Sequence, residues 1–268
     1  MFPSVEGGDE VSGRGDSAAS PEYLPPEIFR RYDIRGLVGQ SVTPEVFELL
    51  GQSFASEAID RGEHSLIVGR DGRLSSPELH AAFCQGLQAA GAEVVDLGQV
   101  PTPLVYFATE FLASDSGAMI TGSHNPRDYN GLKLVLQGET LGGAGLQALR
   151  TRIEEGNLRR GEGSCVEQDL VPDYIDRVTE DVQLARPLRL VVDCGNGVAG
   201  PVVLRLLREL GCEVIELFCE VDGSFPNHHP DPSQPNNLLP LIMEVGAQEA
   251  DLGLAFDGDA DRVVADIG

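Results

Sequence analysis

The chain has 268 residues and a mass of 28.6 kDa, which is the size of one large domain or two ordinary ones. Its 43 acidic residues outnumber its 19 basic residues, so the formal net charge is −24, and the basic residues form no cluster. A protein that binds nucleic acid or an anionic membrane needs positive charge on at least one face, so both partners are excluded. No apolar stretch approaches the roughly 18–20 residues of a membrane span.

Residues 1–25 are acidic, rich in Gly and Ser, and lack an apolar core. This composition predicts a disordered lead-in and not a signal peptide. The five cysteines are scattered without a C-x-x-C pair, and their odd number argues against a disulfide framework or a zinc site. We therefore expect reduced thiols and a cytoplasmic protein.

Short apolar runs alternate with amphipathic segments through the first half of the chain. Residues 65–68 predict a strand, residues 77–90 a helix with apolar positions every four residues, and residues 93–97 a second strand. This succession of strand, helix and strand is a βαβ unit. The same reasoning predicts further elements: a helix over residues 103–112 and strands over residues 118–120 and 132–136.

The same plan recurs in the second half. It predicts a strand over residues 188–193, a turn at 195–197, a helix over 202–210 and a strand over 213–217. Residues 88–97 and 208–217 also share one order. In each, the end of a helix is followed by a glycine, a small residue, a glutamate and a strand in which apolar and polar residues alternate. Two similar α/β modules are therefore favoured over one continuous sheet. The charged segment 154–169 is the predicted boundary, which gives domains at residues 26–168 and 169–268.

Three aspartates, Asp257, Asp259 and Asp261, follow the apolar run 252–256 at alternate positions. They lie where a predicted strand ends, which is where open α/β sheets bind ligands. A tight turn would bring the three carboxylates together, and their mutual repulsion would be relieved by a cation. Hard oxygen ligands in so short a loop favour Mg²⁺, whereas Arg262 stands where an EF-hand requires glycine. The alternative is a solvated acidic turn.

A serine loop, Thr-Gly-Ser-His-Asn-Pro at residues 121–126, directly follows another predicted strand. The turn presents Ser123 beside His124, and Lys133 lies a few residues further on. A serine hydroxyl is a poor nucleophile unless a base, a charge or a metal assists it. The segment is not the G-x-S-x-G elbow of hydrolases. These residues alone leave two interpretations open: Ser123 is a nucleophile, or the segment is simply a hydrogen-bonded turn.

A glycine pattern at residues 195–200 follows a strand, precedes a helix and has Glu216 near the end of the next strand. These features match most of the dinucleotide-binding fingerprint. Asp193, however, lies two residues before the first glycine, where its charge would repel a pyrophosphate. An NAD-binding dehydrogenase is therefore the weaker alternative.

Other polar residues carry less information. Arg35 could present a guanidinium fork to phosphate or form an ordinary salt bridge. His64 and His80 are predicted to lie on the surface. The pair His228 and His229 lies between prolines, which favours a structural role over metal binding.

Four segments carry a family resemblance: residues 32–36, 68–73, 121–133 and 257–262. Taken in this order, they make the chain resemble the α-D-phosphohexomutase family. The serine loop and residues 225–232 are similar to its bacterial phosphomannomutase/phosphoglucomutase branch. The resemblance extends over residues 29–268 and implies two similar mixed-sheet α/β domains.

The resemblance also implies a set of site residues. Ser123 would be the phosphocarrier, and its phosphate would bind one Mg²⁺ together with Asp257, Asp259 and Asp261. Phosphoryl transfer to a hexose phosphate would give a hexose 1,6-bisphosphate, which would also act as the activator that phosphorylates Ser123. Lys133 matches the position of a general acid/base, and we expect neighbouring cations to lower its pKa. The residues that would steady the phosphoserine and the sugar are Tyr32, Arg35, His124 and Arg262.

Members of this family have four domains, so the resemblance implies that the chain holds the first two, with domains three and four absent. We expect hexose phosphates as partners and a truncated form with little mutase activity alone. A non-catalytic, Mg²⁺-dependent sugar-phosphate-binding fragment is the alternative that stays open.

Overall fold

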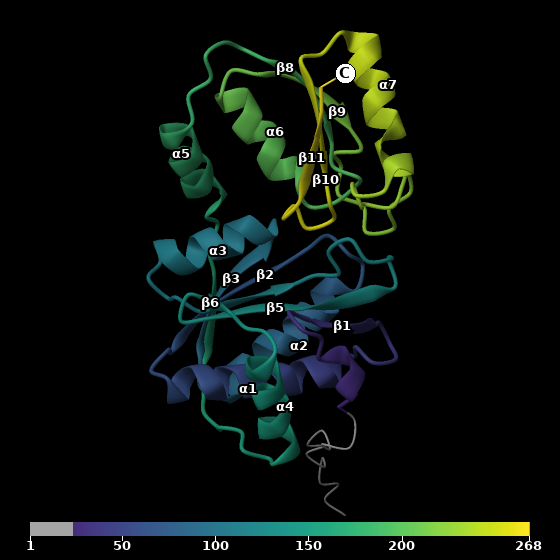
Figure 1. Cartoon of the computed structure of the whole chain (residues 1–268). Coiled ribbons are helices and arrows are strands. Elements are labelled where there is room, and N and C mark those ends of the chain that lie inside the picture. The colour runs from purple at the N-terminus through teal and green to yellow at the C-terminus, as the bar shows by residue number, and fades with distance from the viewer. Residues whose placement is uncertain (1–23, 268) are drawn as a thin grey trace, which may run out of the picture.

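Two β-sheets organise the chain into two α/β units, one above the other in Figure 1. This computed structural model describes residues 24–267, so the predicted lead-in at residues 1–25 falls almost wholly outside the described part. Among the helices of residues 24–267, none is long and apolar enough to cross a membrane.

The first unit contains a seven-stranded mixed sheet in the order β1-β5-β4-β2-β3-β7, with β6 paired to β5. Strands β4, β2, β3 and β7 are parallel, whereas β5 runs antiparallel to β4, and β1 antiparallel to β5. Its elements are β1 (Ile34–Leu37), α1 (Pro44–Asp60), β2 (Ser65–Arg70), α2 (Ser76–Ala89), β3 (Glu93–Gln99), α3 (Thr102–Phe111), β4 (Gly117–Ile120), β5 (Tyr129–Leu136), β6 (Glu139–Thr140), α4 (Ala144–Glu154) and β7 (Ser164–Glu167), preceded by a short 3-10 turn, η2 (Pro26–Ile28).

Helices α1, α2 and α4 cover one face of this sheet, and α3 covers the other (Figure 1). Two glycines let α1 and α2 pack backbone to backbone. A Cβ at Gly51 would lie 2.2 Å from the carbonyl oxygen of Phe83, and a Cβ at Gly86 would lie 2.0 Å from that of Glu48. Because neither position has room for a methyl group, the close crossing of the two helices depends on both glycines.

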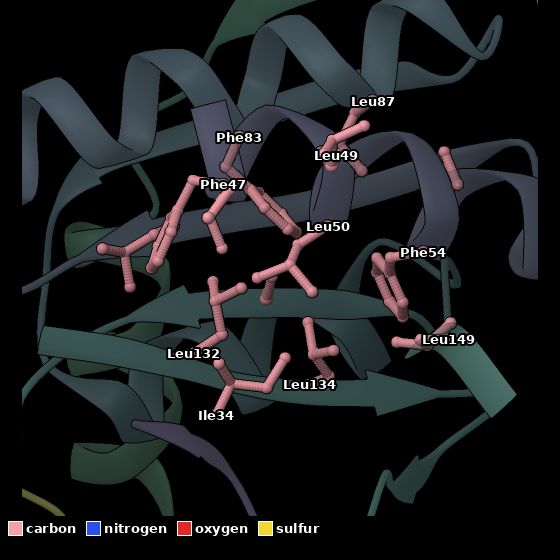
Figure 2. Packing of buried hydrophobic residues seen from close by; sticks show 14 of the residues in the cluster. Ile34, Phe47, Leu49, Leu50, Phe54, Phe83, Leu87, Leu132, Leu134 and Leu149 are labelled. Carbon is pink, nitrogen blue, oxygen red and sulfur yellow. The ribbon is translucent and has the colours of Figure 1, made fainter. Parts of the chain in front are cut away.

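The core between these helices and the sheet is aromatic and aliphatic (Figure 2). The ring of Phe83 lies 6.4 Å, centroid to centroid, from both Phe47 and Phe54 of α1. Leu132 and Leu134 of β5 face these rings from the sheet. Each such side chain contributes on the order of 1.5–3 kcal/mol by leaving water, so this cluster gives the serine-bearing unit a rigid base.

The second unit contains a four-stranded sheet in the order β11-β10-β8-β9, in which only β11 is antiparallel. Helix α6 covers one face and α7 the other. Helix α5 packs against α6, and its Tyr174 ring lies 5.4 Å from Phe107 of α3, so α5 contacts both units. The elements are α5 (Val171–Asp181), β8 (Arg189–Asp193), α6 (Gly200–Glu209), β9 (Glu213–Leu217), η3 (Pro235–Leu238), α7 (Leu239–Gln248), β10 (Leu252–Phe256) and β11 (Val263–Asp266).

The predicted likeness of the two modules is confirmed. After α2 the chain turns at Gly91, with φ +98°, and enters β3; after α6 it turns at Gly211, with φ +85°, and enters β9. Glycine adopts these positive φ angles at little cost. The predicted linker at residues 154–169 differs, because it contains β7, which pairs with β3 and extends the first sheet.

Candidate functional site

The serine loop of the first unit and the aspartate loop of the second unit meet where β4 and β10 end. The Ser123 hydroxyl donates a hydrogen bond to Oδ2 of Asp257, over 3.0 Å. The two backbones are also close, since a Cβ at Gly258 would lie 2.7 Å from the carbonyl oxygen of Ser123. Two polar segments separated by more than 100 residues in the sequence thus form one site.

The serine loop has an unusual backbone. Ser123 is buried and has a φ of +47°, which is uncommon for a residue with a Cβ and marks a held conformation. Thr121 Oγ1 accepts from the Ser123 amide over 2.7 Å and donates to Asp71 Oδ2 over 2.8 Å. The same carboxylate oxygen accepts from the Gly122 amide over 3.0 Å. Asp71, at the end of β2, therefore fixes the turn that presents the serine.

Arg73 holds the same loop from the other side. It is fully buried and its Nε lies 3.2 Å from Asp71 Oδ2. A Cβ at Gly122 would lie 2.1 Å from that Nε, so the loop closes around the guanidinium. Its terminal nitrogens donate to four backbone carbonyls of the loop and of the strand that follows: Ser123, Asn125, Pro126 and Tyr129, at 2.6–3.1 Å.

Sequence reasoning gave neither Asp71 nor Arg73 a role, although both lie in a segment that the family resemblance includes. A signal was present, because adjacent parallel strands β2 and β4 end at the same edge of a sheet. Polar residues directly after β2 were therefore candidates for contact with the loop after β4.

The three aspartates converge as predicted. Ligand oxygens of Asp257, Asp259 and Asp261 all lie within 4.8 Å of one another; the first two side chains are buried and the third is 28% exposed. Burial and the two neighbouring carboxylates raise the pKa of Asp257 to about 8. Oδ1 of Asp259 is buried and has no hydrogen-bond partner. An all-oxygen donor set with excess negative charge and an unsatisfied buried oxygen fits a hard divalent cation such as Mg²⁺.

Lys133, on β5 of the first unit, reaches into this cluster. Its Nζ lies 2.6 Å from Asp259 Oδ2 and 2.5 Å from Asp261 Oδ2. Thr102 also donates to Asp259 Oδ2, over 2.6 Å. Burial alone would raise the pKa of Asp259, but the Lys133 ammonium outweighs it and the pKa falls to about 2.

The predicted direction of the Lys133 pKa is wrong. Burial lowers this pKa, but the carboxylates of Asp259 and Asp261 outweigh burial and raise it above its usual value. The expectation assumed cationic neighbours, whereas the side chain lies between two anions. Lys133 is therefore an ammonium ion in this structure.

His124 and Arg35 flank the serine. Nδ1 of His124 lies 3.3 Å from Ser123 Oγ, and burial together with the charge of Arg262 lowers the pKa of this histidine. Arg35 is only 3% exposed; it pairs with Asp33 over 2.6 Å and donates to Asn125 Oδ1 over 3.3 Å. The salt-bridge reading of Arg35 is thus confirmed, whereas its contact with a phosphate stays a prediction.

Tyr32 and Arg262 lie further out. Tyr32 is 64% exposed, and its ring lies beneath the Arg31 guanidinium, 5.0 Å away. The Arg262 side chain is half exposed, and its Nε comes no closer than 4.0 Å to Asp261. Neither side chain contacts Ser123 in the structure, so their predicted contacts with a substrate stay a prediction.

The glycine turn at residues 195–200 has no room for a dinucleotide. His228 Nε2 lies 2.9 Å from Asp193 Oδ2, and the Gly195 amide donates to Asp193 Oδ1 over 2.8 Å. A Cβ at Gly195 would lie 3.2 Å from both His228 and Pro230. The loop that carries His228 therefore covers the turn where a pyrophosphate would bind, which argues against the dehydrogenase reading.

The histidine predictions are partly wrong. His64 is exposed, as predicted, but His80 is buried and its Nε2 lies 3.0 Å from Asp96 Oδ1. Leu79 and Phe83, on the same turn of α2, are buried in the core, and this packing draws His80 inward.

Comparison with known proteins matches residues 26–160 to phosphoglucomutase/phosphomannomutase alpha/beta/alpha domain I, and residues 172–266 to domain II. The chain is 54% identical over 247 residues to a phosphomannomutase/phosphoglucomutase of Pseudomonas aeruginosa, covering 92% of this chain and 53% of that protein. It is 46% identical over 239 residues to a phosphoglucomutase of Neisseria meningitidis, covering 88% and 52%.

A solved structure of a phosphoglucomutase/phosphomannomutase family protein from Burkholderia thailandensis superposes with a TM-score of 0.87 at 47% identity, over 90% of this chain and 55% of that one. The chain thus spans about half the length of the relatives that it matches. The two mixed-sheet units coincide with the two matched domains, and the chain belongs to the phosphoglucomutase/phosphomannomutase family.

Proposed function

We propose that this chain carries the phosphoserine and metal-binding parts of a phosphohexomutase site, which interconverts hexose 1-phosphates and hexose 6-phosphates through a bisphosphate intermediate. The observation that carries the proposal is the 3.0 Å contact between Ser123 Oγ and Asp257 Oδ2. This contact joins the serine hydroxyl of one unit to the carboxylate cluster of the other, which supports a nucleophilic role for Ser123. An isolated turn or an isolated acidic loop would need no such partner.

Ser123, Asp257, Asp259 and Asp261 would hold one Mg²⁺. Supporting this assignment are the convergence of the three carboxylates and the partnerless Oδ1 of Asp259. When bound, Mg²⁺ supplies charge neutralisation for the transferring phosphoryl group, the main requirement of such reactions.

The residues around Ser123 would position the phosphoryl group and move protons. In transfer to a sugar, the bond between Ser123 Oγ and phosphorus breaks, a sugar hydroxyl oxygen bonds to phosphorus, and the hydroxyl proton must leave. Lys133, once it has lost a proton, is placed to accept one, and as the ammonium ion it can return it. His124, with its lowered pKa, presents a neutral imidazole whose Nδ1 faces Ser123 Oγ.

Three further side chains would bind the substrate phosphate and sugar. Arg35 is preordered by Asp33 and keeps a buried Nε without a hydrogen-bond partner. Tyr32 is exposed, and Arg262, which directly follows the aspartate loop, is half exposed, so a ligand can reach both side chains. Since guanidinium groups bind phosphate through two parallel hydrogen bonds, these arginines suit a hexose phosphate.

The test is covalent labelling followed by mass measurement. The protein is incubated with Mg²⁺ and glucose 1,6-bisphosphate, and its intact mass is recorded. Transfer breaks one ester bond of the bisphosphate, forms the bond from phosphorus to Ser123 Oγ, and passes the serine proton to the released sugar oxygen. We expect one added phosphoryl group per chain.

The Ser123→Ala variant should gain no phosphoryl group, whereas Ser164→Ala, which changes an exposed serine on β7, should gain one as the unaltered chain does. A wild-type chain that binds Mg²⁺ and bisphosphate but never gains mass would favour the alternative, a non-catalytic sugar-phosphate-binding protein. Because the chain spans about half of its relatives, we expect little conversion of glucose 1-phosphate to glucose 6-phosphate by this chain alone.

A further inference from the structure

Lys133 is the only lysine in the 268-residue sequence, and every other basic side chain is arginine. The two residue types differ chemically. Lysine carries a compact point charge with three rotatable donors, whereas arginine carries a broad planar fork that does not deprotonate in proteins. The chain has arginine at every other Lys or Arg position and lysine only at 133. This choice points to a requirement for a compact ammonium group at that position.

The surroundings of Lys133 show which groups the ammonium contacts. Its side chain is 13% exposed, and Nζ lies between Asp259 Oδ2 at 2.6 Å and Asp261 Oδ2 at 2.5 Å. Both carboxylates belong to the second unit, whereas Lys133 lies on β5 of the first. The ammonium is thus the counter-ion of an acidic cluster that would otherwise have none within hydrogen-bonding distance among the described side chains.

The lysine and a metal ion would lie close together on the same carboxylates. Lys133 pairs with Oδ2 of Asp259, whereas Oδ1 of Asp259 has no hydrogen-bond partner and would be free to bind the ion. Mg²⁺ takes oxygen ligands at about 2.0–2.1 Å. Two cations at a few ångströms repel strongly in a partly buried site, so a bound ion disfavours the present position of the ammonium group.

We propose that Lys133 is a built-in stand-in for the metal: it neutralises the aspartate loop when no cation is bound, and divalent cation binding displaces it from Asp259 and Asp261. This inference rests on the proposed function and deepens it. Displacement frees the Lys133 side chain from the two carboxylates, and the proposed chemistry uses this side chain as an acid and a base.

The proposal predicts opposite effects of Lys133→Met in the two states. Without metal, the variant leaves three carboxylates without their counter-ion, so the protein loses stability. With metal bound, Lys133 no longer pairs with these carboxylates, so its removal costs little. By linkage, the variant must bind Mg²⁺ more tightly than the wild type, and we expect at least a tenfold decrease in Kd.

The experiment measures urea unfolding of the wild type and Lys133→Met in EDTA and in saturating Mg²⁺, together with calorimetric Mg²⁺ titrations. Arg127→Met is the matched control, because it removes an exposed positive charge from the serine loop without altering the carboxylate cluster. In EDTA we expect Lys133→Met to have a lower free energy of unfolding than the wild type, and in saturating Mg²⁺ we expect this difference to disappear. The difference between the wild type and Arg127→Met should be the same in both conditions.

A second readout needs no variant. Selective isotope labelling of lysine gives one side-chain NMR signal, since Lys133 is the sole lysine. We expect its Nζ and Cε resonances to change on addition of Mg²⁺, with the same midpoint as the calorimetric titration.

The outcomes separate the two proposals. If Mg²⁺ binds the wild type but the stability gap of Lys133→Met persists in Mg²⁺, or the lysine signal does not change, displacement is wrong while the metal site stands. If Mg²⁺ binds neither protein, the metal site and the displacement both fail.

Discussion

At the scale of single residues, one buried arginine determines how the serine is presented. Arg73 donates to four backbone carbonyls, three in the serine loop and one at the start of β5, and pairs with Asp71. Replacing it with methionine leaves Asp71 as a buried charge without its partner, which typically costs about 3–5 kcal/mol. We expect urea unfolding of Arg73→Met to show a loss of this size. Arg127→Met, an exposed change in the same loop, should stay within about 0.5 kcal/mol of the wild type, and equal losses in the two variants would contradict the role of Arg73.

A half-buried histidine, His228, gives the second unit a pH dependence. His228 donates from Nε2 to Asp193 and from Nδ1 to the His229 carbonyl, so both ring nitrogens carry protons and the ring is charged. Burial lowers its pKa, but the bonds to Asp193 and to the carbonyl outweigh burial and raise the pKa above its usual value of 6.5. The resulting stabilisation is complete below pH 6.5 and is lost as the pH rises through the folded-state pKa.

Unfolding of the wild type and His228→Gln at several pH values tests this dependence. At pH 6 we expect the variant to be less stable by about 1.5–3 kcal/mol, the usual contribution of hydrogen bonds to charged groups. The gap should shrink toward pH 9. His64→Gln, at an exposed position, should give no gap that changes with pH, and a pH-independent gap for His228→Gln would disprove a charged His228.

Residues that carry chemistry were predictable where the sequence keeps them in one short segment. Asp257, Asp259 and Asp261 are alternate residues after an apolar run, and Ser123 lies in a turn with an uncommon composition. Arg73 was not predictable as a positioning residue from its neighbours alone, because its partners are carbonyl oxygens about 50 residues away, which every residue type supplies.

At the scale of secondary structure, elements with a clear apolar period were predicted and others were not. The strand β10 was predicted with the bounds that the structure has, whereas α1 was missed. Ten of its 17 residues are buried, on more than one face of the helix, so its sequence shows no simple apolar stripe. The strand β7 was missed for the opposite reason, since all four of its residues are exposed and only pairing with β3 makes it a strand.

The crossing of α1 and α2 gives a prediction that reverses helix propensity. Glycine to alanine inside a helix normally stabilises by roughly 0.5–1 kcal/mol. At Gly86, however, the new Cβ would lie 2.0 Å from the Glu48 carbonyl oxygen, so the helices must separate, which typically costs about 1–3 kcal/mol. Gly246→Ala on α7 is the matched control, because nothing lies within 4 Å of its Cβ position. Denaturant unfolding should show opposite signs for the two variants, and stabilisation by Gly86→Ala would contradict the close crossing.

At the scale of the whole molecule, the candidate site is also a contact between the two units. Thr102 and Lys133 of the first unit both bind Asp259 of the second, and Arg73 lies 5.2 Å from the Phe225 ring across the same interface. The net charge of −24 describes the surface of this acidic chain but not the site, where cationic side chains and a metal would receive phosphate. Net charge alone therefore argues against nucleic acid as a partner but gives no sign of the phosphate-binding site that we propose.

Net charge and a bound metal make separable contributions to stability. Any salt screens the repulsion among surplus acidic groups, since the Debye length is about 8 Å at 0.15 M ionic strength. Mg²⁺ held by the aspartate loop adds a specific term, about 2.7 kcal/mol at a concentration 100 times its Kd. We therefore expect MgCl₂ to raise the free energy of unfolding more than NaCl of equal ionic strength.

The difference between the two salts should vanish in Asp259→Asn, because this change removes a carboxylate from the metal-binding cluster, while the gain from NaCl persists. Glu180→Gln, an exposed change on α5 that removes the same charge elsewhere, should keep the full difference. If MgCl₂ and NaCl raised the free energy of unfolding of the wild type equally, Mg²⁺ would act only by screening charge, and specific binding by the aspartate loop would be contradicted. A difference that survives in Asp259→Asn would place the bound ion away from these aspartates, because Asp259 is one of the two fully buried carboxylates of the cluster and has an oxygen without a hydrogen-bond partner.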